Sequence, residues 1–203
     1  MHLKQLKAYS INVLLQSCLN EDILRIGQID FTRDFRVFHK DDAGRVDLQV
    51  YEGADAVREI VRYDDAGNYR PLKTAPNLRH NWELRLASVE ELRLALDFFY
   101  PAALGHWLAW LRNAFHAIPL RQTLGRQSGM YRVAARITDV QAQDLIRNFC
   151  GQGCLRHIGW GIATSQELVL NPENREIPLL CPEACHLYIS EARRVVKSNS
   201  STQ

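Results

Sequence analysis

The 203-residue sequence lacks the features that mark several large classes of protein. Its most apolar stretch, residues 94–111, is interrupted by Asp97, Pro101 and His106, so it fits two core helices better than a membrane span. The formal net charge is only +2, which is too small to indicate binding to nucleic acid or to a membrane surface. The N-terminus has no apolar run followed by a cleavage site, so it does not resemble a signal peptide. We therefore expect a cytoplasmic protein with no nucleic-acid partner and no membrane partner.

Signatures of catalysis are also scarce. We find no convincing acid–base pair, no Ser/His/Asp combination and no phosphate-binding loop with its lysine. The C-x-x-x-C-x-x-C pattern of radical-SAM enzymes is missing, because Cys154 is followed by Leu155-Arg156-His157. The sequence therefore favours a binding or redox protein over an enzyme.

Cysteine is the residue type that points most directly to a function, although the sequence contains only five cysteines. So few, and an odd number, argue against a disulfide scaffold. Cys150 and Cys154 form one C-x-x-x-C pair, and Cys181 and Cys185 form a second, with residues 155–180 between them. Two close pairs suit a four-thiolate metal site, because each pair supplies two ligands from one backbone segment. We interpret Cys18, which has no cysteine close to it in sequence, as a small buried hydrophobic residue.

Several kinds of four-cysteine arrangement remain open at this point. A [4Fe–4S] cluster is the favoured cofactor, and a structural Zn(Cys)₄ site is the alternative. Zinc sites usually have two residues within each cysteine pair, whereas both pairs here have three, which favours the cluster. A disulfide is disfavoured in a reducing compartment. Two unrelated buried cysteine pairs are the least favoured interpretation.

The residues next to the cysteines predict their local structure. Cys181-Pro182 resembles a helix start, with Pro182 at the first helical position, which would place Cys181 and Cys185 one turn apart at the positive end of a helix dipole. Gly151 suits the C-cap of a preceding helix. Gly151 and Gly153 would also leave backbone N–H groups free to approach a cluster. Candidate neighbours of the metal centre are Arg156, His157, Trp160 and His186.

Two basic segments could bind an anion or a carboxylate-rich substrate. Residues 69–82 contain two prolines and predict an ordered surface loop, and residues 121–132 are punctuated by glycine. The alternative is that the cations of both segments are merely solvated. The candidate contacts are Arg70, Lys73, Arg79, Arg126 and Arg132.

The hydrophobic pattern predicts an α+β fold, with a small antiparallel sheet and short helices in the N-terminal half and a helical C-terminal half. Strand-like sequence runs from Ile23 to Glu52, with a hairpin turn predicted at residues 41–44. Residues 54–63 predict a short helix and residues 82–87 a further strand. Ser88 and Thr138 open capping boxes of later helices. We expect an α+β part over 1–87, a helical metal-binding part over 88–197 and a frayed tail over 198–203.

Four segments together resemble a known module. They are YRPLKTAPNL at 69–78, RQSGMYR at 126–132, the stretch 150–160, and CPEAC at 181–185. The sequence from about Ile23 to about Arg194 is similar to the iron–sulfur cluster-binding module that is C-terminal to a sirohydrochlorin (CbiX-like) chelatase-related protein of Deinococcus. The resemblance implies an α+β stabilising part and a helical part that binds [4Fe–4S] through Cys150, Cys154, Cys181 and Cys185.

The resemblance also guides expectations about function. The chelatase domains that precede the module have no counterpart here, so we do not expect this chain alone to insert metal into a tetrapyrrole. We expect electron transfer or redox or iron sensing, beside a redox partner or an enzyme of tetrapyrrole (sirohydrochlorin, cobalamin or sirohaem) metabolism. An enzyme that binds a carboxylate-rich tetrapyrrole beside the cluster is the alternative. The oligomeric state, including a homodimer, is left open.

Overall fold

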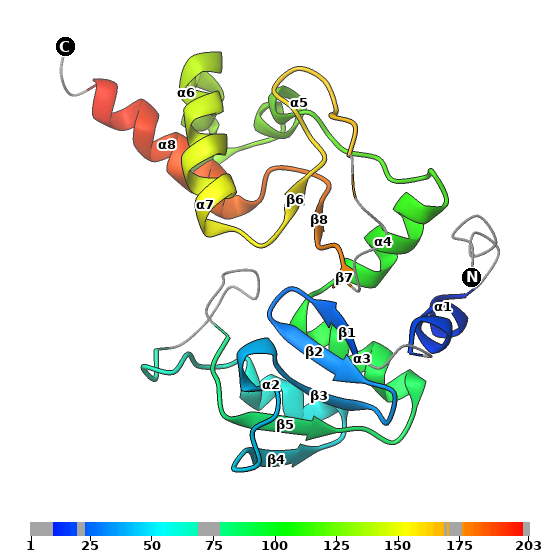
Figure 1. The fold of residues 1–203 in the computed structure, drawn as a ribbon. Helices are drawn as coiled ribbons and strands as arrows, with labels where there is room; N and C mark the ends of the chain where they lie inside the picture. Colours follow the sequence, from blue (N-terminus) through cyan, green and yellow to red (C-terminus); the bar gives the residue numbers. More distant parts are fainter. Residues whose placement is uncertain (1–9, 20–22, 69–77, 169, 171–175, 201–203) are drawn as a thin grey trace. The chain divides into compact units, whose positions relative to one another are not determined.

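The chain divides into two compact units in the computed structural model (Figure 1). The structure describes residues 10–19, 23–68, 78–168, 170 and 176–200. Unit 1 comprises Met1–Ala114 and Leu170–Leu179, and unit 2 comprises Phe115–Val169 and Leu180–Gln203. The sequence placed the main boundary after residue 87. Two helices that follow residue 87 instead belong to unit 1, because their apolar faces pack there rather than in unit 2.

Unit 1 is built on a mixed six-stranded sheet of order β4-β5-β3-β2-β1-β7. The predicted α+β class is confirmed. The sheet is not purely antiparallel, however, because β1 pairs with β7 and β4 pairs with β5 in parallel. The strands are β1 (Ile23–Ile26), β2 (Ile29–Thr32), β3 (Arg36–His39), β4 (Gln49–Glu52), β5 (Trp82–Arg85) and β7 (Glu176–Ile177).

The predicted hairpin at residues 41–44 is wrong, because β5 lies between β3 and β4 in the sheet. Gly44 does adopt the left-handed conformation, with φ of 82°. The turn is held toward the start of β5 by Asp42, whose buried carboxylate accepts the Asn81 N–H at 2.7 Å. A tight antiparallel connection occurs instead between β1 and β2, where Ile26 lies opposite Ile29.

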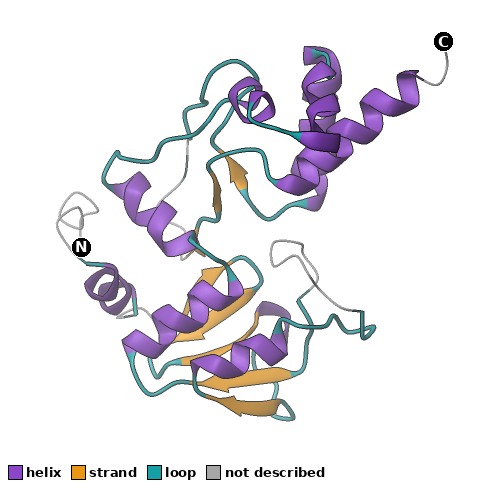
Figure 2. Ribbon diagram, turned by 180° about the vertical axis from the view of Figure 1, so that it is seen from behind, coloured by secondary structure: helices purple, strands orange, loops and turns teal. Residues whose placement is uncertain are grey.

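The two faces of the sheet differ in chemistry, as alternation along the strands requires. One face is apolar and is covered by α2 (Val57–Ile60) and α3 (Val89–Phe99), as Figures 1 and 2 show. Trp82 of β5 stacks there on Phe99 of α3, with ring centroids 5.2 Å apart. On the other face, Arg25 donates two hydrogen bonds, of 2.6 and 2.8 Å, to the buried carboxylate of Asp30.

Glu83 is the second buried carboxylate of that charged face, and its loss is expected to destabilise unit 1. Its side chain accepts hydrogen bonds from Arg36 and, at 2.7 Å, from Arg85. The Arg36 bond is the main cause that lowers the pKa of Glu83 below its ordinary value. Glu83→Gln should therefore reduce the free energy of unfolding by about 1–3 kcal/mol at neutral pH.

The pH dependence of this effect follows from the sign of the shift. A lowered carboxyl pKa contributes stability that is present above the unfolded pKa of about 4.3 and is lost as pH falls through the folded pKa. Urea unfolding followed by circular dichroism should show the wild type and Glu83→Gln converging in acid. The exposed Glu52→Gln is the control. An equal gap at neutral and acid pH would contradict this assignment.

Helices complete unit 1. The predicted helix over 54–63 is confirmed as η3 followed by α2, and Ser88 caps α3 by accepting the Glu91 N–H. The remaining helical elements are α1 (Ile11–Cys18), η2 (Lys40–Asp42), η3 (Ala54–Ala56) and α4 (Ala103–Leu111). Among the described helices, none is both long and apolar enough to cross a bilayer.

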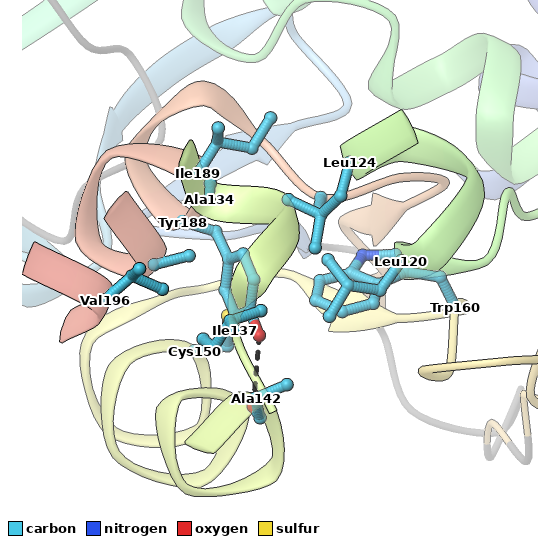
Figure 3. Packing of buried hydrophobic residues seen from close by; sticks show 12 residues of the cluster. Leu120, Leu124, Ala134, Ile137, Ala142, Cys150, Trp160, Tyr188, Ile189 and Val196 are labelled. Atoms are coloured by element: carbon cyan, nitrogen blue, oxygen red, sulfur yellow. Dashed lines mark hydrogen bonds between the residues drawn. The ribbon is translucent and has the colours of Figure 1, made fainter. Parts of the chain in front are cut away.

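Unit 2 is mainly helical. It contains α5 (Leu120–Gly125), η4 (Gly129–Arg136), α6 (Asp139–Leu145), η5 (Ile146–Cys150), α7 (Gly151–Gly153), the two-residue strands β6 (His157–Ile158) and β8 (Leu180–Cys181), and α8 (His186–Ser200). Both η4 and α6 pack on α8. At their junction the buried Tyr188 donates its hydroxyl to the Ala142 carbonyl at 3.0 Å (Figure 3). This core fixes the positions of the segments that carry the cysteine pairs.

Candidate metal centre

The first cysteine pair follows a helix whose start was predicted correctly. Thr138 and Gln141 form a reciprocal capping box at the N-terminus of α6. The helix then widens into the π-helical segment η5, which ends at Cys150. The prediction that Gly151 ends the helix is wrong. Gly151 keeps right-handed helical geometry with φ of −72° because its N–H bonds to the Ile146 carbonyl, and the chain becomes extended only at Cys154.

The second cysteine pair is not on one helix, contrary to the sequence prediction. Cys181 ends strand β8, which pairs in parallel with β6, and its carbonyl accepts the Gly159 N–H at 3.0 Å. Helix α8 begins only at His186. Cys185 directly precedes it, and its carbonyl accepts the Ile189 N–H. The positive end of the helix dipole therefore lies at Cys185 rather than at Cys181.

The four thiols lie close enough to affect one another. Burial raises the pKa of the Cys150 thiol to about 12, and the charges of Cys154, Cys185 and Cys181 add to that rise. Burial also raises the pKa of Cys181. Because a metal ligand is the thiolate, binding of a metal here must displace protons from these buried thiols.

Exposure differs from one cysteine to the next. Cys150 is buried beside the ring of Tyr188, as Figure 3 shows. Cys154 and Cys181 are partly buried, and Cys185 is exposed. The group of thiols thus extends from the hydrophobic core of unit 2 to its surface.

Cys181 has the best-defined surroundings of the four. The indole Nε1–H of the buried Trp160 donates to its sulfur at 3.3 Å. The thiol in turn donates to the Glu183 carbonyl at 3.1 Å. Trp160 also packs edge-on against Tyr188, with ring centroids 5.2 Å apart. Hydrogen bonds to a thiolate sulfur and an apolar shell are the means by which proteins tune a bound iron–sulfur centre.

The arrangement of the four sulfurs is relevant to whether the site suits one zinc ion or an iron–sulfur cluster. Four thiolates at about 2.3 Å from one tetrahedral zinc ion would lie roughly 3.8 Å apart. Within the described parts of the chain, His39, Asp41 and His80 form a group of three potential ligands whose ligand atoms all lie within 4.8 Å of one another. None of the described cysteines belongs to such a group. No three of the cysteine sulfurs therefore converge to within that limit of one another. A four-iron cluster does not require such convergence, because it binds each thiolate at a different iron.

The predicted neighbours of the metal centre take different positions. Arg156 donates its backbone N–H to the Cys154 sulfur at 3.5 Å, and its guanidinium bonds the Leu180 carbonyl at 3.0 Å. Trp160 contacts Cys181 as described. His157 and His186 are exposed, on β6 and at the first position of α8.

The predicted anion contacts are separated between the two units. In unit 2, Arg126 forms an ion pair with Glu183 in the loop between Cys181 and Cys185, while Arg132 is exposed on η4. In unit 1, Arg79 bonds the Tyr51 hydroxyl and lies over its ring. Arg70 and Lys73 lie outside the described residues.

Sequence reasoning missed one group of potential ligands, His39, Asp41 and His80 in unit 1. Asp41 was interpreted only as part of a turn, and the two histidines are distant in sequence. The His39-Lys-Asp41 spacing was the only local signal, and it is too common to be informative.

Gly161 is expected to be intolerant of a side chain, because it closes the loop that follows Trp160. A Cβ at this position would lie 2.6 Å from the Thr164 carbonyl oxygen, which is backbone and cannot move aside cheaply. Gly161→Ala should destabilise unit 2 by about 1–3 kcal/mol. Thermal unfolding can measure this. The control is Gly125→Ala, where a Cβ meets nothing within 4 Å, and equal stability of the two variants would contradict the prediction.

Comparison with known proteins finds two family models that match successive parts of the chain. Residues 19–110 match the model of the DR2241 stabilising domain, and residues 112–194 match that of a 4Fe-4S iron-sulfur cluster binding domain. Among solved structures, the chain is similar to DR2241 from Deinococcus radiodurans, with 28% sequence identity and a TM-score of 0.79 over 92% of this chain. That protein is described as multi-domain, with structural similarity to chelatases and two additional novel domains. No curated protein matches the chain.

The chain spans 41% of the length of the Deinococcus protein, so the match concerns part of that molecule. All four paired cysteines fall within residues 112–194. The two matches together span most of the chain, and the second indicates an iron–sulfur protein that binds a [4Fe–4S] cluster.

Proposed function

We propose that Cys150, Cys154, Cys181 and Cys185 hold the [4Fe–4S] cluster and that the cluster exchanges single electrons with a partner protein. Support for the ligand set comes from the mutual influence of the four thiols and from their position inside the cluster-binding domain. The Trp160 indole and the Arg156 backbone N–H already point at two of the sulfurs. When bound, the cluster supplies reversible one-electron chemistry.

The observation that favours electron exchange is the gradient of burial. Cys150 is buried in the core of unit 2, while Cys185 is exposed at the N-terminus of α8. A cluster held by both would have one corner in the apolar interior and one at the surface. A partner could then approach the exposed corner, while the buried side excludes water from the iron.

A tetrapyrrole-linked role is the second candidate. It is favoured by the similarity of the Deinococcus protein to chelatases. In this case the cluster would serve an enzyme of tetrapyrrole metabolism, or unit 2 would hold a carboxylate-rich tetrapyrrole through exposed cations such as Arg132. Arg126 is a weaker contact for such a substrate, because Glu183 already neutralises it.

The test uses the full chain, purified or reconstituted without oxygen. Electron paramagnetic resonance during a potentiometric titration should show one centre that is reduced and reoxidised without loss of iron. A cluster that loses iron within one redox cycle would contradict electron exchange.

The second candidate is tested by titrating the same protein with sirohydrochlorin and with a metal-free porphyrin carboxylate. It requires saturable binding of one of these compounds, and Arg132→Ala should weaken that binding.

A further inference from the structure

In unit 1, two histidines and an aspartate that are distant from the cysteines in sequence converge on one point. His39 ends β3, Asp41 lies in η2, and His80 directly precedes the segment that leads into β5. One ring nitrogen of each histidine and a carboxylate oxygen of Asp41 all lie within 4.8 Å of one another. The Asp41 Oδ2 is 3.6 Å from His39 Nδ1 and 3.8 Å from His80 Nε2.

These separations fit ligands of one ion better than they fit hydrogen bonds. Both exceed hydrogen-bond length, so the carboxylate does not bond directly to either nitrogen at these positions. Ligands at about 2.0–2.2 Å from a tetrahedral metal ion lie roughly 3.4 Å apart. A small movement of Asp41, whose side chain is 60% exposed, would bring its carboxylate oxygen to that spacing from each of the two nitrogens.

A fourth residue holds His80 in the orientation that ligation requires. Asp65 lies 2.5 Å from His80 Nδ1 through Oδ2, and its other oxygen accepts the His80 backbone N–H at 2.7 Å. The ring nitrogen opposite to this contact is Nε2, which faces Asp41. A carboxylate on the far nitrogen of a histidine is the usual companion of metal-ligating imidazole, since it fixes the tautomer and the ring orientation.

His39 is the buried member of the group. Its side chain has 0% exposure, and its ring lies 4.0 Å from that of His80 between centroids. Its Nδ1, the nitrogen that faces Asp41, accepts the Asp41 N–H at 3.2 Å, so this lone pair already points to the side of the ring where Asp41 lies. A metal ion bound at Nδ1 would replace that hydrogen bond, and Nε2 would keep the ring proton.

We propose that His39, Asp41 and His80 bind a divalent transition-metal ion of the zinc class, with Asp65 as the positioning residue. Two imidazoles select such ions over magnesium or calcium, which prefer oxygen ligands. Three protein ligands leave a fourth position, as in zinc sites that bind water or a substrate. The exposed side of Asp41 and the partly exposed His80 leave that position accessible from solvent. This site uses none of the cysteines and does not depend on the function proposed for them.

Calorimetric titration of Zn²⁺ into the cluster-loaded full chain tests the site, with the visible absorption of the cluster recorded to confirm that zinc does not displace iron. We expect one zinc ion per chain in addition to the cluster. His80→Gln, at a partly exposed position, should remove this binding. Asp65→Asn should weaken it about 10- to 100-fold, as loss of an outer hydrogen-bond partner does.

The matched control is His116→Gln, because His116 is an exposed histidine of unit 2. This variant should bind zinc as the wild type does. Since His39→Gln alters a buried residue, the proposal relies on His80 and Asp65, and circular dichroism should show that both variants fold. No zinc binding by the wild type, or binding that is unchanged in His80→Gln, would overturn the proposal.

Discussion

Replacing Cys181 with serine is expected to abolish retention of the [4Fe–4S] cluster. Cys181 bonds to the Trp160 indole and to the Glu183 carbonyl, and it ends strand β8. A serine oxygen is a much poorer ligand for iron than a thiolate. Iron and acid-labile sulfide, measured after anaerobic reconstitution and desalting, should fall from about four of each per chain to near zero.

The fifth cysteine provides the control for this experiment. Cys18 lies at the end of α1 in unit 1, outside both pairs. Cys18→Ser should keep the iron, the sulfide and the visible spectrum of the wild type. If Cys18→Ser lost the cluster and Cys181→Ser retained it, the proposed ligand set would be wrong.

Substitutions of Trp160 are expected to have the second large effect. Two different substitutions distinguish its contribution to the stability of unit 2 from its contribution to the reduction potential of the cluster. Trp160 is 1% exposed and packs on Tyr188. Trp160→Ala should therefore reduce the free energy of unfolding by about 3–5 kcal/mol. Trp160→Phe keeps most of the packing but removes the N–H that points at the Cys181 sulfur.

The phenylalanine variant should shift the reduction potential of the cluster to more negative values. A hydrogen bond to sulfur stabilises the more negatively charged reduced state, so its loss makes reduction harder. A bond worth about 1 kcal/mol corresponds to roughly 40 mV for a one-electron couple. Potentiometric titration measures the shift, with Trp110→Phe of unit 1 as the control. An unchanged or more positive potential would contradict a role for the indole in tuning the cluster.

Much of the molecule was predictable from local sequence. The two C-x-x-x-C pairs identified the cofactor, because ligand type and spacing are written in the chain itself. The caps at Ser88 and Thr138 were predicted for the same reason, since a side chain three residues away satisfies the first free N–H groups of a helix. The α+β class followed from hydrophobic periodicity.

Features that depend on distant partners were not predictable. Pro182 suggested a helix start at Cys181, but pairing of β8 with β6 and the Gly159 N–H hold this cysteine in an extended strand instead. The turn at residues 41–44 suggested a hairpin, but Asp42 bonds Asn81 and β5 occupies the place beside β3. In both cases a backbone partner from a remote segment outweighed a local preference.

The sequence by itself determined which atoms are available to bind metal, and only the tertiary structure decided which of them meet. A close pair of cysteines predicts a metal site from sequence, because two of the candidate ligands lie on one short segment. His39 and His80 share no such pattern, and they come together only because β3 and β5 are neighbours in the sheet. Pairing between strands distant in sequence is a cooperative property of the whole sheet, so no window of sequence contains it.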